Sequence, residues 1–223
     1  MSGNFKVNKT KRFEEMGKSF LCGLGINCRI NNNINVTSTD YIAEFNGKEY
    51  FIDFQFSQNF SKYKDIRVDI ISAYNISNSK NNRFNLQNII HDNYEHFQKN
   101  GLKELNKYIK IKKLGKVINE DISHLFYFVY DNFAKVNITP DHIYIVRRTD
   151  MLKYIEDNIV DIIKEKCLKL NDKSSLGDNF GSAFVALNAD SLKSKGVGLW
   201  LDMNVKEIKN YLNEKNLIDR DMI

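Results

Sequence analysis

Hydrophobic and polar positions follow their clearest pattern over residues 40–57. Residues 41–45 and 49–56 are two runs rich in aromatic and β-branched side chains, and Asn46-Gly47 separates them. An Asn-Gly dipeptide between two such runs is the strongest short-range signal for a β-hairpin with a two-residue turn. The pattern therefore predicts two antiparallel strands here, and a third strand over residues 65–72.

The rest of the chain alternates between helical and strand patterns. Apolar residues at helical spacing predict helices over residues 13–24, 84–111 (one or two helices), 151–170 and 205–217. Short apolar runs predict strands over residues 124–130, 142–146, 183–187 and 197–201. This order predicts an α/β fold with a central mixed β-sheet flanked by helices. Residues 75–83 form a polar linker, but no domain linker is visible. We therefore expect one domain over residues 1–223, with a core at about 10–160 and an extension at about 171–223.

Composition narrows the class of protein. Hydrophobic residues make up 42% of the 223 residues and charged residues 27%, which is typical of a packed globular protein. The longest apolar run, residues 125–130, is too short to span a bilayer, and no secretory signal is visible. The three cysteines lack the Cys-x-x-Cys spacing of zinc and redox sites. We therefore expect a cytoplasmic protein without a membrane partner.

Charge adds a candidate nucleic-acid contact. The net charge is +5, and residues 101–118 hold six lysines against one glutamate. On a helix, Lys103, Lys107 and Lys110 would share one face, which could contact phosphates. The alternative is an ordinary solvated helix face.

Two aspartates of the predicted hairpin face each other. A two-residue turn at Asn46-Gly47 places Asp40 opposite Asp53, with Gln55 on the same face as Asp53. Opposed carboxylates repel each other unless a divalent cation binds between them, and such a cation could activate water against a phosphodiester. A solvated edge face is the alternative, because Glu44 and Glu49 are opposed in the same way.

These residues resemble a nuclease signature. Thr39-Asp40, twelve further residues and then Asp53-Phe54-Gln55 are similar to the motif of the PD-(D/E)XK nuclease superfamily. That superfamily includes type II restriction endonucleases and archaeal Holliday junction resolvases. Arg12-Phe13-Glu14-Glu15 resembles the acidic first helix of its members, and the resemblance covers roughly residues 10–160.

The resemblance implies roles for individual residues. Asp40 and Asp53 would bind Mg²⁺ (with Mn²⁺ as an alternative), and Glu14 or Glu15 would assist. Gln55 stands where the motif has lysine, and it would position water or phosphate without supplying a positive charge. Some restriction endonucleases are similar in having glutamine there, even within a Gln-Phe-Ser run like residues 55–57.

Other basic residues could complete the site. Lys62 or Lys64, in the loop after the second hairpin strand, could replace the missing charge. Arg67 or Asp69 could line the site if the third strand pairs beside Asp53. Solvated loop lysines and a cross-strand ion pair are the respective alternatives.

The resemblance implies a restriction-endonuclease-like core and a metal-dependent endodeoxyribonuclease acting on double-stranded DNA. Cutting both strands of a two-fold symmetric target suggests a homodimer. One alternative is a junction-resolving or mobile-element nuclease of the same superfamily. Another is a catalytically inactive nuclease fold that binds DNA or protein.

Overall fold

The computed structural model shows two compact units of chain. The first unit comprises residues 1–63, 121–147 and 198–223, and the second comprises residues 64–120 and 148–197. The single domain expected from the sequence stays a prediction. The structure describes residues 17–23, 25–31, 41–45, 48–58, 60–75, 88–131, 140–171 and 180–201. Asp40, Glu14, Glu15 and the predicted helix over residues 205–217 lie outside these ranges.

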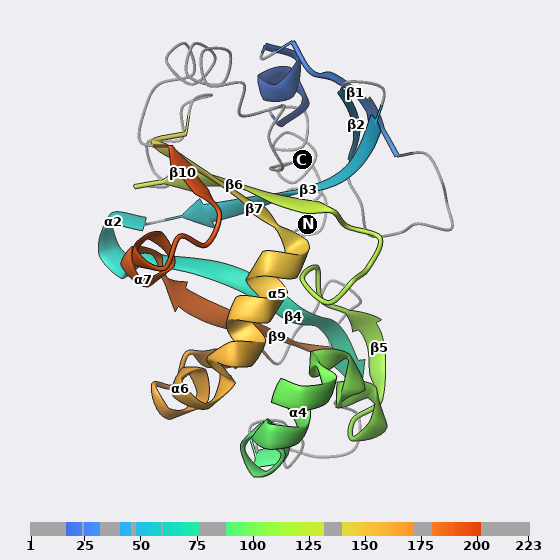
Figure 1. Cartoon of the computed structure of the whole chain (residues 1–223), viewed down its shortest axis with the longest axis vertical. Coiled ribbons are helices and arrows are strands. Elements are labelled where there is room, and N and C mark those ends of the chain that lie inside the picture. The colour runs from blue at the N-terminus through green and yellow to red at the C-terminus, as the bar shows by residue number, and fades with distance from the viewer. Residues whose placement is uncertain are drawn as a thin grey trace, which may run out of the picture. The chain divides into compact units, whose positions relative to one another are not determined.

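The first unit contains a six-stranded mixed sheet with the strand order β1-β2-β3-β6-β7-β10 (Figure 1). The β3–β6 pair is parallel, and the other pairs are antiparallel. A four-residue helix, α2 (Phe60–Tyr63), follows β3, and residues 17–23 are also helical. The strands are β1 (Asn27–Ile30), β2 (Tyr41–Phe45), β3 (Lys48–Gln58), β6 (His124–Tyr130), β7 (His142–Arg147) and β10 (Leu199–Leu201).

One face of this sheet forms a hydrophobic core. Tyr41, Ile52 and Phe54 are buried in one hydrophobic cluster, together with Phe20 of the 17–23 helix. The Phe20 and Phe128 rings meet edge to face, with centroids 5.4 Å apart. Alternation along β2 and β3 therefore gives the hairpin one face that packs in this core.

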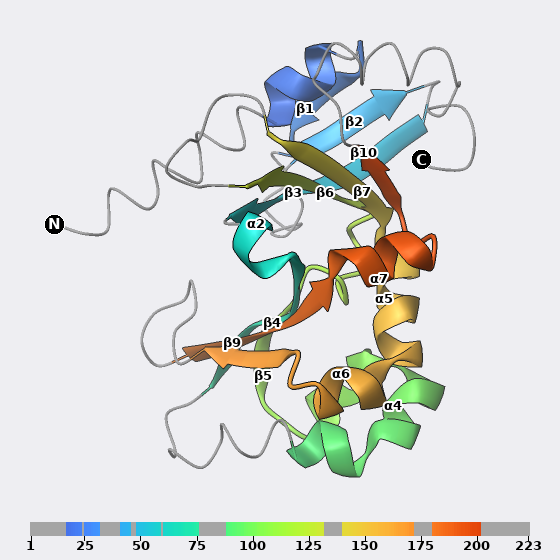
Figure 2. The same ribbon diagram turned by 90° about the vertical axis from the view of Figure 1, so that its left-hand side faces the viewer.

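The second unit contains a four-stranded antiparallel sheet with the order β5-β4-β9-β8. Helices α4, α5 and α6 lie to one side of it (Figure 2). Residues 88–92 are also helical. The strands are β4 (Asp65–Asn75), β5 (Ile111–Leu114), β8 (Leu168–Asn171) and β9 (Phe180–Asn188); the helices are α4 (Tyr94–Asn100), the 3-10 helix η1 (Leu102–Lys107), α5 (Arg148–Asp157), α6 (Ile159–Lys164) and α7 (Ala189–Ser194). The predicted α/β architecture, with a mixed sheet and flanking helices, is confirmed.

The third strand does not pair beside Asp53, which was the condition for placing Arg67 or Asp69 at the site. Residues 65–72 do form a strand, β4, but it pairs with β5 and β9 in the second sheet. The neighbours of β3 are β2 and β6. All seven residues of β6 are buried, as suits a central strand packed on both faces, so β6 takes the place beside β3. Arg67 and Asp69 are therefore not on a strand adjacent to Asp53.

The predicted lysine face at residues 101–118 is also wrong. Lys103 and Lys107 lie on η1, whereas Lys110 precedes β5. Gly101, at φ +87°, ends α4 in a backbone conformation that favours glycine, so no α-helix continues through this segment.

The predicted helix over residues 151–170 is interrupted. Asn158 separates α5 from α6, and its side-chain amide donates to the Tyr154 carbonyl at 2.7 Å. Lys166 then adopts a positive φ of 55°, and the chain enters β8.

Candidate functional site

The hairpin has the register that the Asn46-Gly47 turn predicts. Tyr41 pairs with Ile52, Ile42 with Phe51, and Glu44 with Glu49. Asp40 directly precedes β2 and lies outside the described residues. The pairing of Asp40 with Asp53 therefore stays a prediction.

Asp53 lies on β3 with an exposed fraction of 0%. Its neighbours in sequence, Ile52 and Phe54, point into the core cluster, so its carboxylate points to the opposite face. A buried carboxylate is costly unless it is hydrogen-bonded. Gln55 Nε2 donates to Asp53 Oδ2. The structure thus brings together two of the predicted site residues, Asp53 and Gln55.

Aromatic side chains lie beside this pair. In the parallel β3–β6 register, Asp53 is opposite Leu125 and Gln55 is opposite Tyr127. The Tyr127 and Tyr144 rings are 5.7 Å apart, and the Tyr144 and Trp200 rings are 5.5 Å apart. Tyr127 is not among the site residues predicted from the sequence. Its place two residues after Leu125 on a buried strand could have identified its face, but not which strand lies next to it.

The two described residues suit a hard divalent cation by chemical type. A carboxylate and an amide oxygen are ligands that Mg²⁺ accepts, and this ion is often held by one or two carboxylates together with waters and substrate phosphates. No group of three or more His, Cys, Asp or Glu side chains within the described ranges could hold a metal.

The predicted basic residues after β3 are exposed. Lys62 lies on α2 with Nζ 5.0 Å from the Tyr63 ring centroid, and Lys64 has a positive φ of 52°. Arg67 lies over the Phe184 ring at 5.4 Å and 3.7 Å from Asp65. The Arg67–Asp65 ion pair lies within β4, and the contact of Arg67 with the Phe184 ring reaches across to β9.

The lysines of residues 101–118 differ in their surroundings. Lys107 forms an ion pair with Glu104. The Lys107 ammonium also donates a hydrogen bond to the Glu104 carboxyl, and this bond lowers the pKa of that carboxyl. Lys110 and Lys103 are exposed. Lys107 is thus engaged within its own helix, while Lys103 lines a pocket described below.

No helix in the described parts of the chain combines the length and apolar character needed to cross a membrane. Neither a protein-family model nor a curated protein nor a solved structure matches the chain.

Proposed function

We propose that this protein is a Mg²⁺-dependent endodeoxyribonuclease of the restriction-endonuclease type, acting on double-stranded DNA in the cytoplasm. The observation that carries the proposal is the buried Asp53 carboxylate on β3, bound by Gln55 two residues later. The proposal includes the finer fold assignment, a restriction-endonuclease-like core. The 17–23 helix, the β2–β3 hairpin and the parallel neighbour β6 support that assignment.

In this proposal the protein positions groups, and the cation supplies the charge. Asp53 would hold Mg²⁺, together with Asp40 and Glu14 by the family resemblance. Gln55 fixes the orientation of the Asp53 carboxylate through its amide N–H. Bound Mg²⁺ would neutralise charge on the phosphate and lower the pKa of an attacking water. Because glutamine cannot carry a positive charge, we expect stronger dependence on the cation than in a lysine-containing site.

A second candidate has one specific observation in its favour. The Gln55 amide donates to Asp53. Because glutamine stands where the motif has lysine, the motif itself supplies no ammonium group. This arrangement also fits a catalytically inactive module that retains the nuclease fold and binds DNA or protein. Fold alone does not separate the two functions.

One experiment separates these functions. The purified protein is incubated with plasmid DNA and with a four-way DNA junction, in Mg²⁺, in Mn²⁺ and in EDTA. We expect discrete plasmid fragments that form with the metal and not with EDTA. Selective cutting of the junction would instead favour a junction-resolving nuclease. Absence of cutting with either metal would contradict the enzyme proposal, and DNA binding without cutting would favour the inactive module.

The proposed homodimer has its own test. Cutting both strands of a symmetric target in one binding event requires two sites. Analytical ultracentrifugation with a cleavable duplex in Ca²⁺ should show two chains for each duplex. One chain for each duplex, with double-strand cuts retained, would contradict the dimer.

A further inference from the structure

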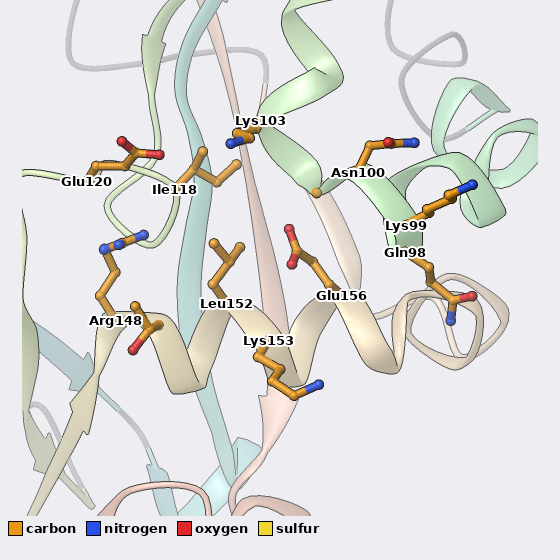
Figure 3. Close-up of a pocket in the computed structure, with 12 residues that line it drawn as sticks. Gln98, Lys99, Asn100, Lys103, Ile118, Glu120, Arg148, Leu152, Lys153 and Glu156 are labelled. Carbon is orange, nitrogen blue, oxygen red and sulfur yellow. The ribbon is translucent and has the colours of Figure 1, made fainter.

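The second unit contains a pocket of about 370 Å³ that is separate from the sheet carrying Asp53. It is formed where three segments meet: the junction of α4 and η1, the turn after β5, and helix α5 (Figure 3). Ligand pockets in proteins have volumes of about 300–1,000 Å³, so this one suits a small ligand such as a single nucleotide.

The charge of the pocket favours an anion. Four basic side chains and two acidic ones line it. Lys153 is already paired with Asp157 at 2.7 Å, and it points away from Lys103 in Figure 3. The basic groups are Lys99, Lys103, Arg148 and Lys153, and the acidic groups are Glu120 and Glu156.

One of the two acids is already engaged by the protein. Glu156 Oε1 accepts a hydrogen bond from the Leu102 backbone N–H at 2.7 Å. Burial raises the pKa of the Glu156 carboxyl despite this bond. Glu120 is exposed. The acids therefore offset the positive charge of the pocket only in part.

Two cations and two apolar side chains form the centre of the pocket. Arg148 and Lys103 lie on either side of Ile118 and Leu152 (Figure 3). Ile118 is 3% exposed, and Arg148 is anchored by donating from Nη1 to the Val117 carbonyl at 3.3 Å. A guanidinium and an ammonium suit phosphate oxygens, and an apolar floor suits the flat face of a base.

We infer that this pocket binds a phosphate-bearing ligand of about the size of one nucleotide. Arg148 and Lys103 contact the phosphate, and Ile118 and Leu152 contact the apolar part. The phosphate belongs either to a free nucleotide or to a nucleic-acid strand. This inference goes beyond the proposed function, because it concerns the second unit and needs no cleavage.

Calorimetry with the full chain in EDTA tests the inference. Thymidine 5′-monophosphate, thymidine and a short oligothymidylate are the probes. We expect saturable binding of a phosphate-bearing probe and none of thymidine. Lys103→Gln and Arg148→Gln should each weaken binding about tenfold, the loss typical of one charge-assisted hydrogen bond. Lys164→Gln, at an exposed position of α6, is the matched control.

The two phosphate sources give different results. Binding of the mononucleotide identifies a free nucleotide as sufficient, and binding of the oligothymidylate alone identifies a nucleic-acid strand. Either result supports the inference if Lys103→Gln weakens binding and Lys164→Gln does not. Lys103 is exposed, so its substitution tests the pocket even if Arg148→Gln disturbs the fold. No saturable binding of any phosphate probe, or equal weakening by Lys164→Gln, would overturn it.

Discussion

At the scale of single residues, the candidate site depends on the environment of Asp53. Its carboxylate has no exposed surface, and Gln55 donates a hydrogen bond to it. An unpaired buried charge costs several kcal/mol, roughly, so the protein gains by placing a donor two residues away on the same strand face. Gln55 thus has a structural role on β3 besides the chemical role that we propose for it.

Replacing Gln55 by alanine tests this role. Loss of a residue that orients a metal ligand typically costs about 10- to 100-fold in metal affinity or activity. If the protein is the nuclease we propose, Gln55→Ala should lower the single-turnover cleavage rate by that factor, with a smaller loss when Mg²⁺ is raised. Asn106→Ala, at an exposed amide of η1, is the control. A wild-type rate and Mg²⁺ dependence in folded Gln55→Ala would contradict the role.

The cysteines give a second prediction at this scale. The Cys22 and Cys28 sulfurs are 4.0 Å apart, and both are free thiols. Burial, with a smaller effect of Cys22, raises the pKa of Cys28 to about 12. The thiolate is the reactive form, so iodoacetamide at pH 8 should modify exposed Cys22 well before Cys28. Mass spectrometry of the digested protein measures both rates. Equal rates in the native protein, matching those in urea, would show that Cys28 is not buried.

At the scale of elements, the position of β3 decides the site. It pairs with β2 in antiparallel orientation through the hairpin and with β6 in parallel, and its two faces carry different kinds of side chain. Phe54 and Ile52 pack in the core, while Asp53 and Gln55 lie on the other face. In the second unit, the backbone at Gly115, directly after β5, lies close to the backbone of β4.

Gly115 provides a test of that approach. Its N–H donates to the Ile70 carbonyl at 3.1 Å, and a Cβ at this position would lie 2.2 Å from the Asp69 carbonyl oxygen. Gly115→Ala should therefore lower the free energy of unfolding by about 1–3 kcal/mol, the usual cost of overpacking. Gly23→Ala is the control, since a Cβ there meets no atom within 4 Å. Urea unfolding measures both variants, and equal stabilities would refute the close approach.

Asp69 on β4 makes stability depend on pH. Burial raises the pKa of its carboxyl above the ordinary value of 3.8, against the opposing effects of Lys116 and Lys113. The folded state then binds this proton more tightly than the unfolded chain. The contribution to stability is present below the unfolded pKa and is lost as pH rises through the raised folded value.

The Asp69→Asn variant isolates this contribution. Asparagine stays neutral, so Asp69→Asn should gain stability relative to wild type as pH rises from 3.5 to 7. Urea unfolding at both pH values measures the difference, and the other acidic groups are common to both proteins. Asp190→Asn, at an exposed position of α7, controls for the substitution itself. A relative stability of Asp69→Asn that falls with pH would reverse the sign and contradict the burial argument.

At the scale of the whole molecule, the sequence predicted individual strands and the hairpin turn, but it did not predict which strands pair with each other. The Asn46-Gly47 turn predicted the hairpin register, and the apolar runs predicted β6 and β7, because these features depend on neighbouring residues. The pattern of residues 65–72 predicts a strand, but it does not indicate which strand pairs with it. The spacing of Lys103, Lys107 and Lys110 fits one face of a helix. Instead, Gly101 ends α4 before these lysines, and the chain after Lys110 forms β5, which pairs with β4.

For the candidate site too, the sequence predicted the features that depend on neighbouring residues and did not predict those that depend on distant ones. The positions of Asp53 and Gln55 on one strand face follow from alternation, and their hydrogen bond agrees with it. The neighbouring Tyr127 and the pocket around Arg148 depend on contacts between segments far apart in sequence. Such contacts are set by packing of the folded chain, so periodicity alone cannot supply them.

We propose above all that Asp53 holds the metal ion that DNA cleavage by this protein requires. The most direct measurement is plasmid cleavage in Mg²⁺ by wild type, Asp53→Asn and Asp190→Asn, after urea unfolding shows that all three are folded. Asparagine keeps an oxygen acceptor for Gln55 but loses the charge. We predict that wild type and Asp190→Asn cut equally in Mg²⁺ and not in EDTA, while Asp53→Asn loses about 1,000-fold or more in rate. Cleavage by folded Asp53→Asn at the wild-type rate would contradict the account.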